Sequence, residues 1–296
     1  MIVVDYNQTG IANFMAEIGS RPGIAPNIDL VRHMIANSLR GYRQKFGEKY
    51  GELVVACDSR TYWRKEVFPL YKAGRKKSRE ESGFDWKAIF EALGTIRDEI
   101  DKFFPYKVIN VEGAEADDVI AILAEWSQTN NLDCSSPFSF SEPKPFMIIS
   151  GDHDFIQLQR YKNVKQYSPT KKAMVTSSTT PEKYVLEHTI RGDKGDGIPN
   201  AFSADDSLVT GERQKPISTK RLNEWLDDPT LLPNDEEFVS RFRRNKKLID
   251  FNQIPSNIKT AIINNFIEQP SKDRSKLFNY FVHNKMKNML DVLEEF

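Results

Sequence analysis

Short apolar runs rich in β-branched residues recur along the first half of the chain, at 2–6, 52–59, 106–112 and 145–150. They do not alternate apolar with polar residues, which is typical of strands covered on both faces. Helical periodicity separates the first two runs, over 28–46, and also the last two, over 115–126. This order predicts an α/β fold with a mainly parallel central sheet and helices on both faces.

The pattern changes in the second half of the chain. The polar, Ser/Pro-rich stretch 127–145 predicts a surface loop, and 164–176 predicts a hairpin. Thr180 followed by Pro181 is typical of a helix start. Helical segments are then predicted at 217–227, 235–248, 256–268 and 273–295. We therefore predict a sheet-containing domain over 1–180 and a mostly α-helical domain over 181–296.

Composition narrows the class of protein. The chain is 39% hydrophobic and 28% charged, the balance of a soluble globular protein, and its two cysteines are too few for a disulfide framework. It has no secretory-type N-terminus and no apolar stretch long enough to span a membrane. We expect a cytoplasmic monomer with no membrane partner. The chain begins directly at the first strand, so we expect no N-terminal docking peptide.

Net charge is zero, but its distribution is uneven. The stretch 59–79 holds eight Lys or Arg and one acid, interleaved with aromatic residues. A run of charge alone also fits a solvated helix face. Here the aromatic side chains, which stack on unpaired bases, favour a nucleic-acid contact.

Acidic residues end or follow each of the four predicted strands. They are Asp5, Asp58, the group Glu115, Asp117 and Asp118, and the pair Asp152 and Asp154. The carboxyl ends of parallel strands meet at one rim, where active sites of such sheets lie. Any one of these acids would also fit a turn or a helix cap. Their recurrence favours a site for Mg²⁺ or Mn²⁺, because clustered carboxylates need cations and no His or Cys is among them.

The motifs around these acids resemble those of a known family. They are VDYNQ at 4–8, ACDSRTYWR at 56–64, EADD at 115–118, SGDHDFIQL at 150–158 and GDKGDGIP at 192–199. Together, in this order, they resemble the 5′-nuclease superfamily of flap endonucleases and the 5′–3′ exonuclease domains of bacterial DNA polymerases. The resemblance covers almost the whole chain.

The resemblance implies a structure-specific 5′ nuclease that removes RNA primers and 5′ flaps during DNA replication by two-metal phosphodiester hydrolysis. Residues 1–180 would be the metal-dependent core, including a basic helical arch over 59–90, and 181–296 the DNA-binding domain. Two alternatives stay open. A PIN-type endoribonuclease shares the sheet and the acids, and a junction-binding protein would share the fold without catalysis.

The resemblance also assigns roles to residues. Two Mg²⁺ ions, replaceable by Mn²⁺, would be held by Asp5, Asp58, Glu115, Asp117, Asp152 and Asp154. A second group, Asp118, Asp193 and Asp196, would bind a further ion directly or through water. Asp152 and Asp154 are therefore expected to be catalytic, and so are Arg64 and Lys72, which would grip the scissile phosphate. Further expected DNA contacts in the arch are Arg60, Trp63, Tyr71, Arg75, Lys76 and Arg79.

One motif departs from the family pattern. In GDKGDGIPN, Gly197 stands where the family usually has Asn, and the GxGxxTA stretch expected after it is missing. This puts in doubt a monovalent-ion site at 192–200. Duplex contacts are instead assigned to Lys215, Lys220 and Arg221, with the basic group at 241–247 as a second candidate.

The expected partners are nucleic acids first: 5′-flap or nicked duplex DNA and RNA–DNA hybrid. Candidate protein partners are a single-stranded-DNA-binding protein or a sliding clamp.

Overall fold

A six-stranded sheet forms the centre of the first of two units in the computed structural model, which describes residues 1–19, 27–129 and 143–296. Unit 1 comprises 1–60, 83–176 and 257–296, and unit 2 comprises 61–82 and 177–256. The strand order is β3-β2-β1-β4-β5-β6, and all neighbours are parallel except β5 and β6. The strands are β1 (Ile2–Asp5), β2 (Leu53–Ala56), β3 (Lys107–Ile109), β4 (Phe146–Ile149), β5 (Val164–Ser168) and β6 (Ala173–Met174). The predicted α/β fold, with its parallel sheet and terminal hairpin, is confirmed.

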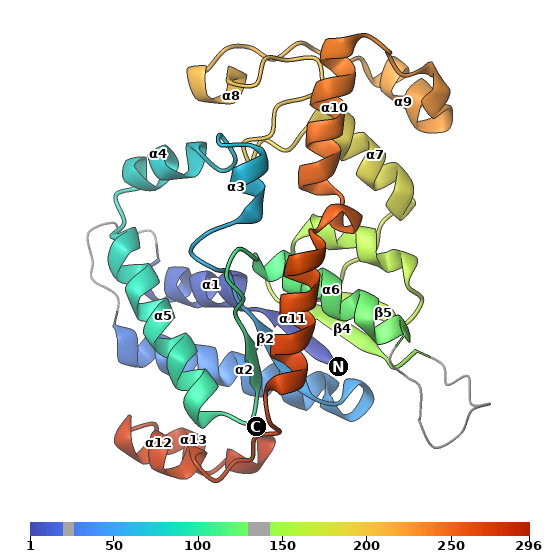
Figure 1. Cartoon of the computed structure of the whole chain (residues 1–296). Coiled ribbons are helices and arrows are strands. Elements are labelled where there is room, and N and C mark those ends of the chain that lie inside the picture. The colour runs from blue at the N-terminus through green and yellow to red at the C-terminus, as the bar shows by residue number, and fades with distance from the viewer. Residues whose placement is uncertain (20–26, 130–142) are drawn as a thin grey trace, which may run out of the picture. The chain divides into compact units, whose positions relative to one another are not determined.

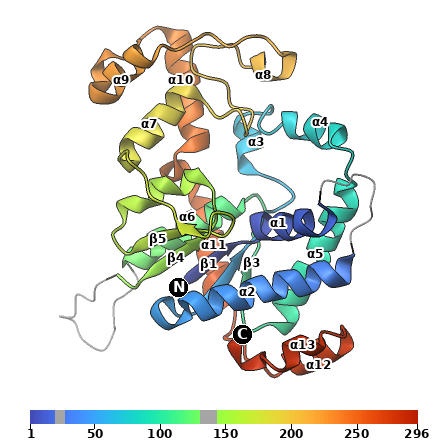
Figure 2. The ribbon, with the colours of Figure 1, turned by 180° about the vertical axis from the view of Figure 1, so that it is seen from behind.

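The sheet of unit 1 is covered on both faces, which explains why its strands are continuously apolar. Val4, Val55 and Ile149 point into a core shared with the helices of one face (Figure 2), namely α1 (Tyr6–Ile18), α2 (Ile28–Tyr50) and α5 (Trp86–Phe103). The other face carries α6 (Ala116–Thr129) and α11 (Ser256–Glu268) (Figure 1). Trp126 and Phe266 join these two helices edge to face, with ring centroids 5.2 Å apart.

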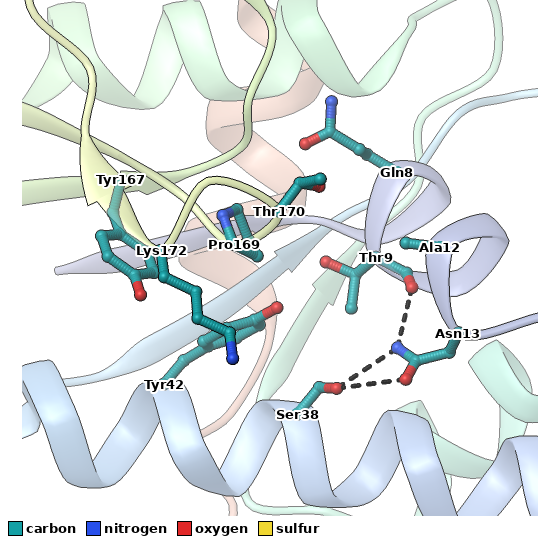
Figure 3. Close-up of a pocket in the computed structure, with 10 residues that line it drawn as sticks. All are labelled: Gln8, Thr9, Ala12, Asn13, Ser38, Tyr42, Tyr167, Pro169, Thr170 and Lys172. Carbon is teal, nitrogen blue, oxygen red and sulfur yellow. Dashed lines mark hydrogen bonds between the residues drawn. The ribbon is translucent and has the colours of Figure 1, made fainter. Parts of the chain in front are cut away.

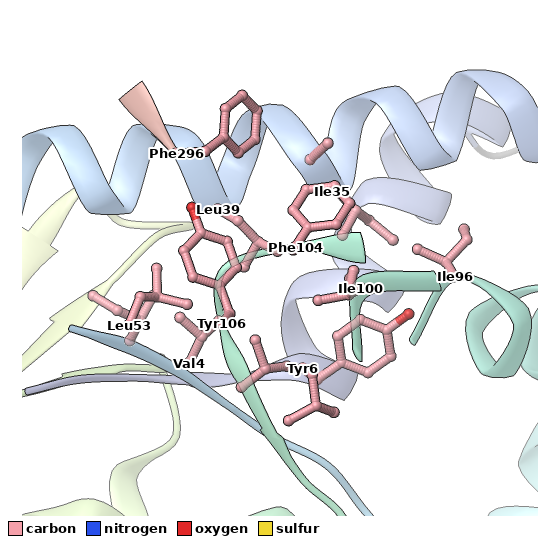
Figure 4. Packing of buried hydrophobic residues seen from close by; sticks show 14 of the residues in the cluster. Val4, Tyr6, Ile35, Leu39, Leu53, Ile96, Ile100, Phe104, Tyr106 and Phe296 are labelled. Atoms are coloured by element: carbon pink, nitrogen blue, oxygen red, sulfur yellow. The ribbon is translucent and has the colours of Figure 1, made fainter. Parts of the chain in front are cut away.

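The C-terminal segment of the chain belongs to the core of unit 1. Phe296 is 1% exposed and lies against Phe104, with ring centroids 5.7 Å apart (Figure 4). Leu277 and Phe281 are also buried in this cluster. The two units therefore do not follow the predicted division at residue 180, because the aromatic residues of 277–296 pack against α2 and α5 rather than ending the helical unit.

The predicted helix over 273–295 is wrong. The chain there forms α12 (Leu277–His283), α13 (Lys287–Leu290) and a final turn η4 (Leu293–Glu295). Lys285 has a φ of 54°, which an α-helix does not permit, so the helix ends before it. This break lets the chain fold back and bury Phe296.

Unit 2 is helical apart from its loops. It contains α3 (Trp63–Val67), α4 (Gly74–Glu81), α7 (Pro181–Arg191), α8 (Ser207–Thr210), α9 (Thr219–Asp227), η2 (Pro229–Leu231), α10 (Glu236–Ile249) and η3 (Phe251–Gln253). Thr180 caps α7 through the Lys183 N–H, as predicted. One aromatic cluster joins α7, α9 and α10, and includes Trp225 stacked on Phe202.

The predicted arch 59–90 divides between the units. Residues 61–82 are in unit 2, where Phe68 and Tyr71 pack with Ile198 and Leu248, and 83–90 lead into α5 of unit 1. Most of the predicted loop 127–145 lies outside the described residues. Among the helices that the structure describes, none combines the length and apolar character needed to cross a membrane.

Candidate functional site

Asp5 ends the central strand β1 and is buried, with 7% of its surface exposed. Its Oδ1 accepts the Gln8 N–H at 3.0 Å, which caps α1, and its Oδ2 lies 3.2 Å from the Ser150 hydroxyl, which donates to it. Burial, reinforced by the negative charges of Asp58 and Asp152, raises the pKa of the Asp5 carboxyl to about 7. Asp58 and Asp152 are therefore close enough to Asp5 to disfavour its ionised form.

Asp58 follows β2 and ties it to two helices of unit 1. Its Oδ1 accepts the N–H of Ala116, the first residue of α6, at 2.7 Å, and its Oδ2 accepts from the Asn7 amide of α1. The Asn110 amide donates to the backbone carbonyl of Asp58 at 2.8 Å. The carboxylate is held at the positive end of α6.

The acids of the third group open α6. Glu115 is 2% exposed and Asp118 is fully buried. Asp118 Oδ2 accepts the backbone N–H of Glu115 at 3.0 Å, half of a capping box with Asp in place of Glu. Asp117 is partly exposed. The helix start is thus rigid, and Asp118 stabilises it directly.

Asp152 and Asp154 follow β4. Asp152 Oδ1 accepts the Asp154 N–H at 2.9 Å and so caps the 3-10 helix η1 (His153–Arg160). The Ser150 hydroxyl accepts the Asp152 N–H at 3.1 Å, and the Gln166 amide of β5 donates to the Ser150 carbonyl at 3.0 Å. Ser150 therefore links the turn after β4 to Asp5 on the neighbouring strand.

The strand order explains why these acids share one edge of the sheet. The chain runs from β1 outward to β2 and β3, then returns to place β4 on the other side of β1. The crevice between the carboxyl ends of β1 and β4 is the switch point, where open parallel sheets bind ligands. Asp5 and Asp152 flank this crevice.

The donor set fits a hard divalent cation. It consists of carboxylate oxygens, and burial, together with the charges of Asp58 and Asp152, raises the pKa of Asp5. Within 1–19, 27–129 and 143–296, no three acidic, His or Cys side chains are placed to hold one ion together.

Sequence reasoning missed the amides and hydroxyl that hold the acids: Asn7, Gln8, Asn110, Ser150 and Gln166. Gln8 Oε1, for example, accepts from the Gly151 N–H and lies 3.2 Å from the Ser150 hydroxyl. The available signal was the same as for the acids, because four of the five come within three residues after the end of a strand, and Gln166 lies in β5.

A pocket of about 500 Å³ opens beside Gln8 (Figure 3). It is lined by α1, α2 and the β5–β6 hairpin, through Gln8, Thr9, Ala12, Asn13, Ser38, Tyr42, Tyr167, Pro169, Thr170 and Lys172. Lys172 carries the one charge among these lining residues. Because Gln8 also contacts Gly151 and Ser150, the pocket borders the acidic site with mostly neutral hydrogen-bonding groups.

The predicted residues of the GDKGDGIP loop lie in unit 2. Asp193 Oδ1 accepts the N–H groups of Gly195 and Asp196, at 2.7 and 3.1 Å, and so closes the loop's turn. The Asp196 carboxylate instead contacts basic side chains, with Arg75 Nη2 at 2.6 Å and Lys72 Nζ at 3.6 Å. The structure therefore pairs Asp196 with predicted phosphate-binding residues.

The predicted DNA-contacting side chains differ in exposure. Arg64 is 3% exposed and its Nε donates to the Leu248 carbonyl at 2.8 Å, so this guanidinium supports the fold of unit 2. Trp63 and Tyr71 are also buried, which leaves little ring surface for stacking on bases. Side chains in exposed positions are Arg60, Arg75, Lys76, Lys215, Lys220 and Arg221, while Lys72 and Arg79 are partly exposed.

Comparison with known proteins supports the sequence resemblance. Residues 30–187 match the family described as "5'-3' exonuclease, N-terminal resolvase-like domain", and 179–296 match "T4 RNase H, C terminal". Ribonuclease H of Enterobacteria phage T4 is 31% identical, over 99% of this chain and 95% of that protein. A 5′-3′ exonuclease of Streptomyces coelicolor is 29% identical over 50% of each chain.

Solved structures share the fold. A phage T5 protein co-crystallised with metal ions has a TM-score of 0.63 at 17% identity, covering 90% of this chain and 98% of that one. The phage T5 flap endonuclease, solved with DNA and metal ions, has a TM-score of 0.58 at 18% identity, covering 99% and 98%. The chain therefore belongs to the 5′-3′ exonuclease family, in the group that includes phage T4 ribonuclease H, and is a phosphodiester hydrolase.

Proposed function

We propose that this protein is a structure-specific 5′ nuclease that removes RNA primers and 5′ flaps during replication, with two Mg²⁺ ions as cofactors. The observation that carries the proposal is the position of Asp5, Asp58 and Asp152 at the carboxyl ends of three adjacent parallel strands, where burial, together with the charges of Asp58 and Asp152, raises the pKa of Asp5. The metal ions and DNA in the phage T5 structures support it by analogy.

The acids of unit 1 would hold the ions. They are Asp5, Asp58, Glu115, Asp117, Asp118, Asp152 and Asp154. Bound ions lower the pKa of the attacking water and neutralise charge on the leaving oxygen. In the hydrolysis, the water oxygen forms a bond to phosphorus and the bond to the 3′ oxygen breaks, which leaves a 5′-phosphate and a 3′-hydroxyl.

The remaining residues would orient the acids and the substrate. Ser150 and Gln8 keep Asp5 and the Asp152 turn in fixed relation, because one hydroxyl contacts both. Lys72 and Arg75 would bind backbone phosphate, and this contact is independent of sequence and weakens with salt. Selection of a flap or nick would then depend on the shape of the junction.

Cleavage of matched 5′-labelled substrates tests the proposal. We expect Mg²⁺-dependent cutting of an RNA-primed flap and a DNA flap near the junction, with 5′-phosphate products and no activity in EDTA. Asp152→Asn should remove cleavage while flap binding stays within about threefold, since binding depends mainly on basic side chains. Asp98→Asn, an equal change of charge on α5 at a side chain 70% exposed, is the control and should cut normally.

Other outcomes would separate the alternatives. Cleavage confined to single-stranded RNA would indicate a PIN-type endoribonuclease. Tight junction binding without cleavage of any substrate, at any Mg²⁺ or Mn²⁺ concentration, would contradict a nuclease role for this chain.

A further inference from the structure

Gln166 is a polar residue buried in the sheet of unit 1. It lies on β5, opposite Ile148 of β4 in the parallel register, and is 2% exposed. Its amide Nε2 donates to the backbone carbonyls of Ser150 and Asp152, at 3.0 and 2.5 Å. We call Ser150, Gly151 and Asp152 the β4 turn, because they directly follow that strand. One side chain therefore holds both ends of the β4 turn.

The amide of Gln166 suits this contact in its number of donors. Its NH₂ group carries two hydrogens, one for each carbonyl, and carbonyl oxygens can only accept. The amide nitrogen therefore faces the β4 turn. Among the residues that the structure describes, none pairs with Gln166 Oε1, although this oxygen is buried. A buried oxygen without a hydrogen bond lowers stability, so stability alone does not account for an amide at this position.

Two other side chains fix the middle of the β4 turn. The Gly151 N–H donates to Gln8 Oε1 at 2.5 Å, and a Cβ placed on Gly151 would lie 3.0 Å from Ser168 Oγ. Gln8 and Ser168 thus confine Gly151 itself, whereas Gln166 acts on the residues before and after it. The path of the backbone through the β4 turn is set by these three side chains together.

The β4 turn positions two of the acids that are proposed to bind metal. Asp152 is its last residue, and the Asp152 carboxylate accepts the Asp154 N–H at 2.9 Å. The directions of both carboxylates therefore depend on a backbone that Gln166 holds in place. Groups that orient metal ligands through hydrogen bonds are usually worth about 10–100-fold in metal affinity or activity.

We propose that Gln166 is a positioning residue for the nuclease reaction. Through the Ser150 and Asp152 carbonyls, it holds the Asp152 and Asp154 carboxylates in the arrangement that binds metal ions, without contacting metal or substrate itself. The inference rests on the proposed function, because it takes these two acids as metal ligands. It adds a residue of β5, outside the acidic motifs, to the groups on which catalysis depends.

The test compares Gln166→Met with Gln159→Met. Methionine has nearly the length of glutamine but lacks its amide donors. Gln159 lies on η1, where its amide donates to the Val175 carbonyl at 3.2 Å, so Q159M removes a similar contact of unit 1 and leaves the contacts of the β4 turn intact. For Q166M we expect kcat on a DNA flap to fall about 10–100-fold. KM should stay within about threefold, because DNA binding depends mainly on basic side chains. Q159M should match wild type.

Two further measurements do not use activity. Mn²⁺ titration of the DNA-free protein, followed by the electron paramagnetic resonance signal of free Mn²⁺, should show binding about tenfold weaker for Q166M and unchanged for Q159M. In the D152N background, Q166M should weaken Mn²⁺ binding less than it does in wild type, because its effect passes through Asp152. Amide hydrogen exchange of the metal-free protein should become faster within 150–154 in Q166M.

Wild-type kcat or wild-type Mn²⁺ affinity in Q166M would overturn the inference. An equal loss of Mn²⁺ affinity from Q166M in wild type and in D152N would also overturn it, since Gln166 would then act elsewhere. If Q166M does not fold, Gln166→Asn keeps the buried amide but is one methylene too short to bind both carbonyls, and the same changes are expected.

Failure of the inference and failure of the proposed function are distinguishable. If wild type neither binds Mn²⁺ nor cuts any flap, the proposed function fails and the inference fails with it. If wild type does both and Q166M behaves like Q159M, the inference fails and the proposed function stands.

Discussion

Asp58 Oδ1 accepts the backbone N–H of Ala116 at 2.7 Å, so a carboxylate at the end of β2 caps the start of α6. The same side chain is proposed to bind metal. A predicted ligand therefore also carries part of the stability of unit 1, and the two roles are separable by experiment.

Asp58→Ala should lower the free energy of unfolding by about 1–2 kcal/mol, the usual cost of losing a helix cap. Urea titration in EDTA at about pH 5 measures this loss. At that pH Asp5 holds its proton, so removing the charge of Asp58 relieves little repulsion between the two acids and the loss of the cap dominates. Asp98→Ala, at an exposed pair, is the control. Equal stability of D58A and D98A would contradict the capping role.

The raised pKa of the Asp5 carboxyl predicts that the stability of the metal-free protein depends on pH. Its folded pKa is about 7, against an ordinary value of 3.8, so the folded state retains a proton that the unfolded state has lost. The stability that protonated Asp5 contributes is fully present when the pH is below 3.8, the ordinary pKa of the carboxyl. This contribution is lost as the pH rises to about 7. Relative to Asp5→Asn, wild type should lose on the order of 2–3 kcal/mol between about pH 5 and pH 7 in EDTA.

Adding Mg²⁺ at about pH 8 should stabilise wild type more than D5N, since the ion neutralises the charge that Asp5 then carries. Urea titrations with and without Mg²⁺ measure both effects. If the difference in unfolding free energy between wild type and D5N did not change with pH, the pKa of the Asp5 carboxyl would not be raised in the folded protein.

Gly197→Ala should destabilise unit 2 more than Gly211→Ala. Both glycines have positive φ, at 70° and 78°, but a Cβ at 211 meets nothing within 4 Å, whereas one at 197 would lie 3.2 Å from the Leu70 carbonyl oxygen and 3.3 Å from the Lys72 nitrogen. G211A isolates the backbone cost of about 1 kcal/mol, and G197A should add a further 1–3 kcal/mol, roughly, for the forced contact. Thermal unfolding with near-ultraviolet circular dichroism compares them, and equal losses would remove the argument for close approach.

Phe296→Ala should cost about 3–5 kcal/mol of unfolding free energy, because the ring is buried against Phe104 and Phe281 in the core of unit 1. Phe278→Ala removes the same ring from a side chain in a 56% exposed residue of α12 and should cost less than about 1 kcal/mol. Urea titration compares the two variants. A mild effect of F296A would mean that the C-terminal segment does not complete this core.

Local pattern by itself predicted the strands and several helices, such as α2, α6 and α10, but it did not predict α1 or α5. Apolar runs such as 146–149 must be buried on both faces, and this requires a layered α/β fold whatever the details. The motifs then indicated the family, and the family matches agree with them. An acid after each strand was enough to predict a shared rim, because parallel strands end together.

Tertiary structure decided what each side chain does there. Whether Asp196 pairs with basic side chains and whether Arg64 reaches solvent depend on groups distant in sequence, namely Arg75 for Asp196 and Leu248 for Arg64. The placement of Phe296 in the core of unit 1 depends in the same way on packing against Phe104. Periodicity reports which face of an element is buried, but partners across the fold are set by three-dimensional packing and charge, which no local pattern contains.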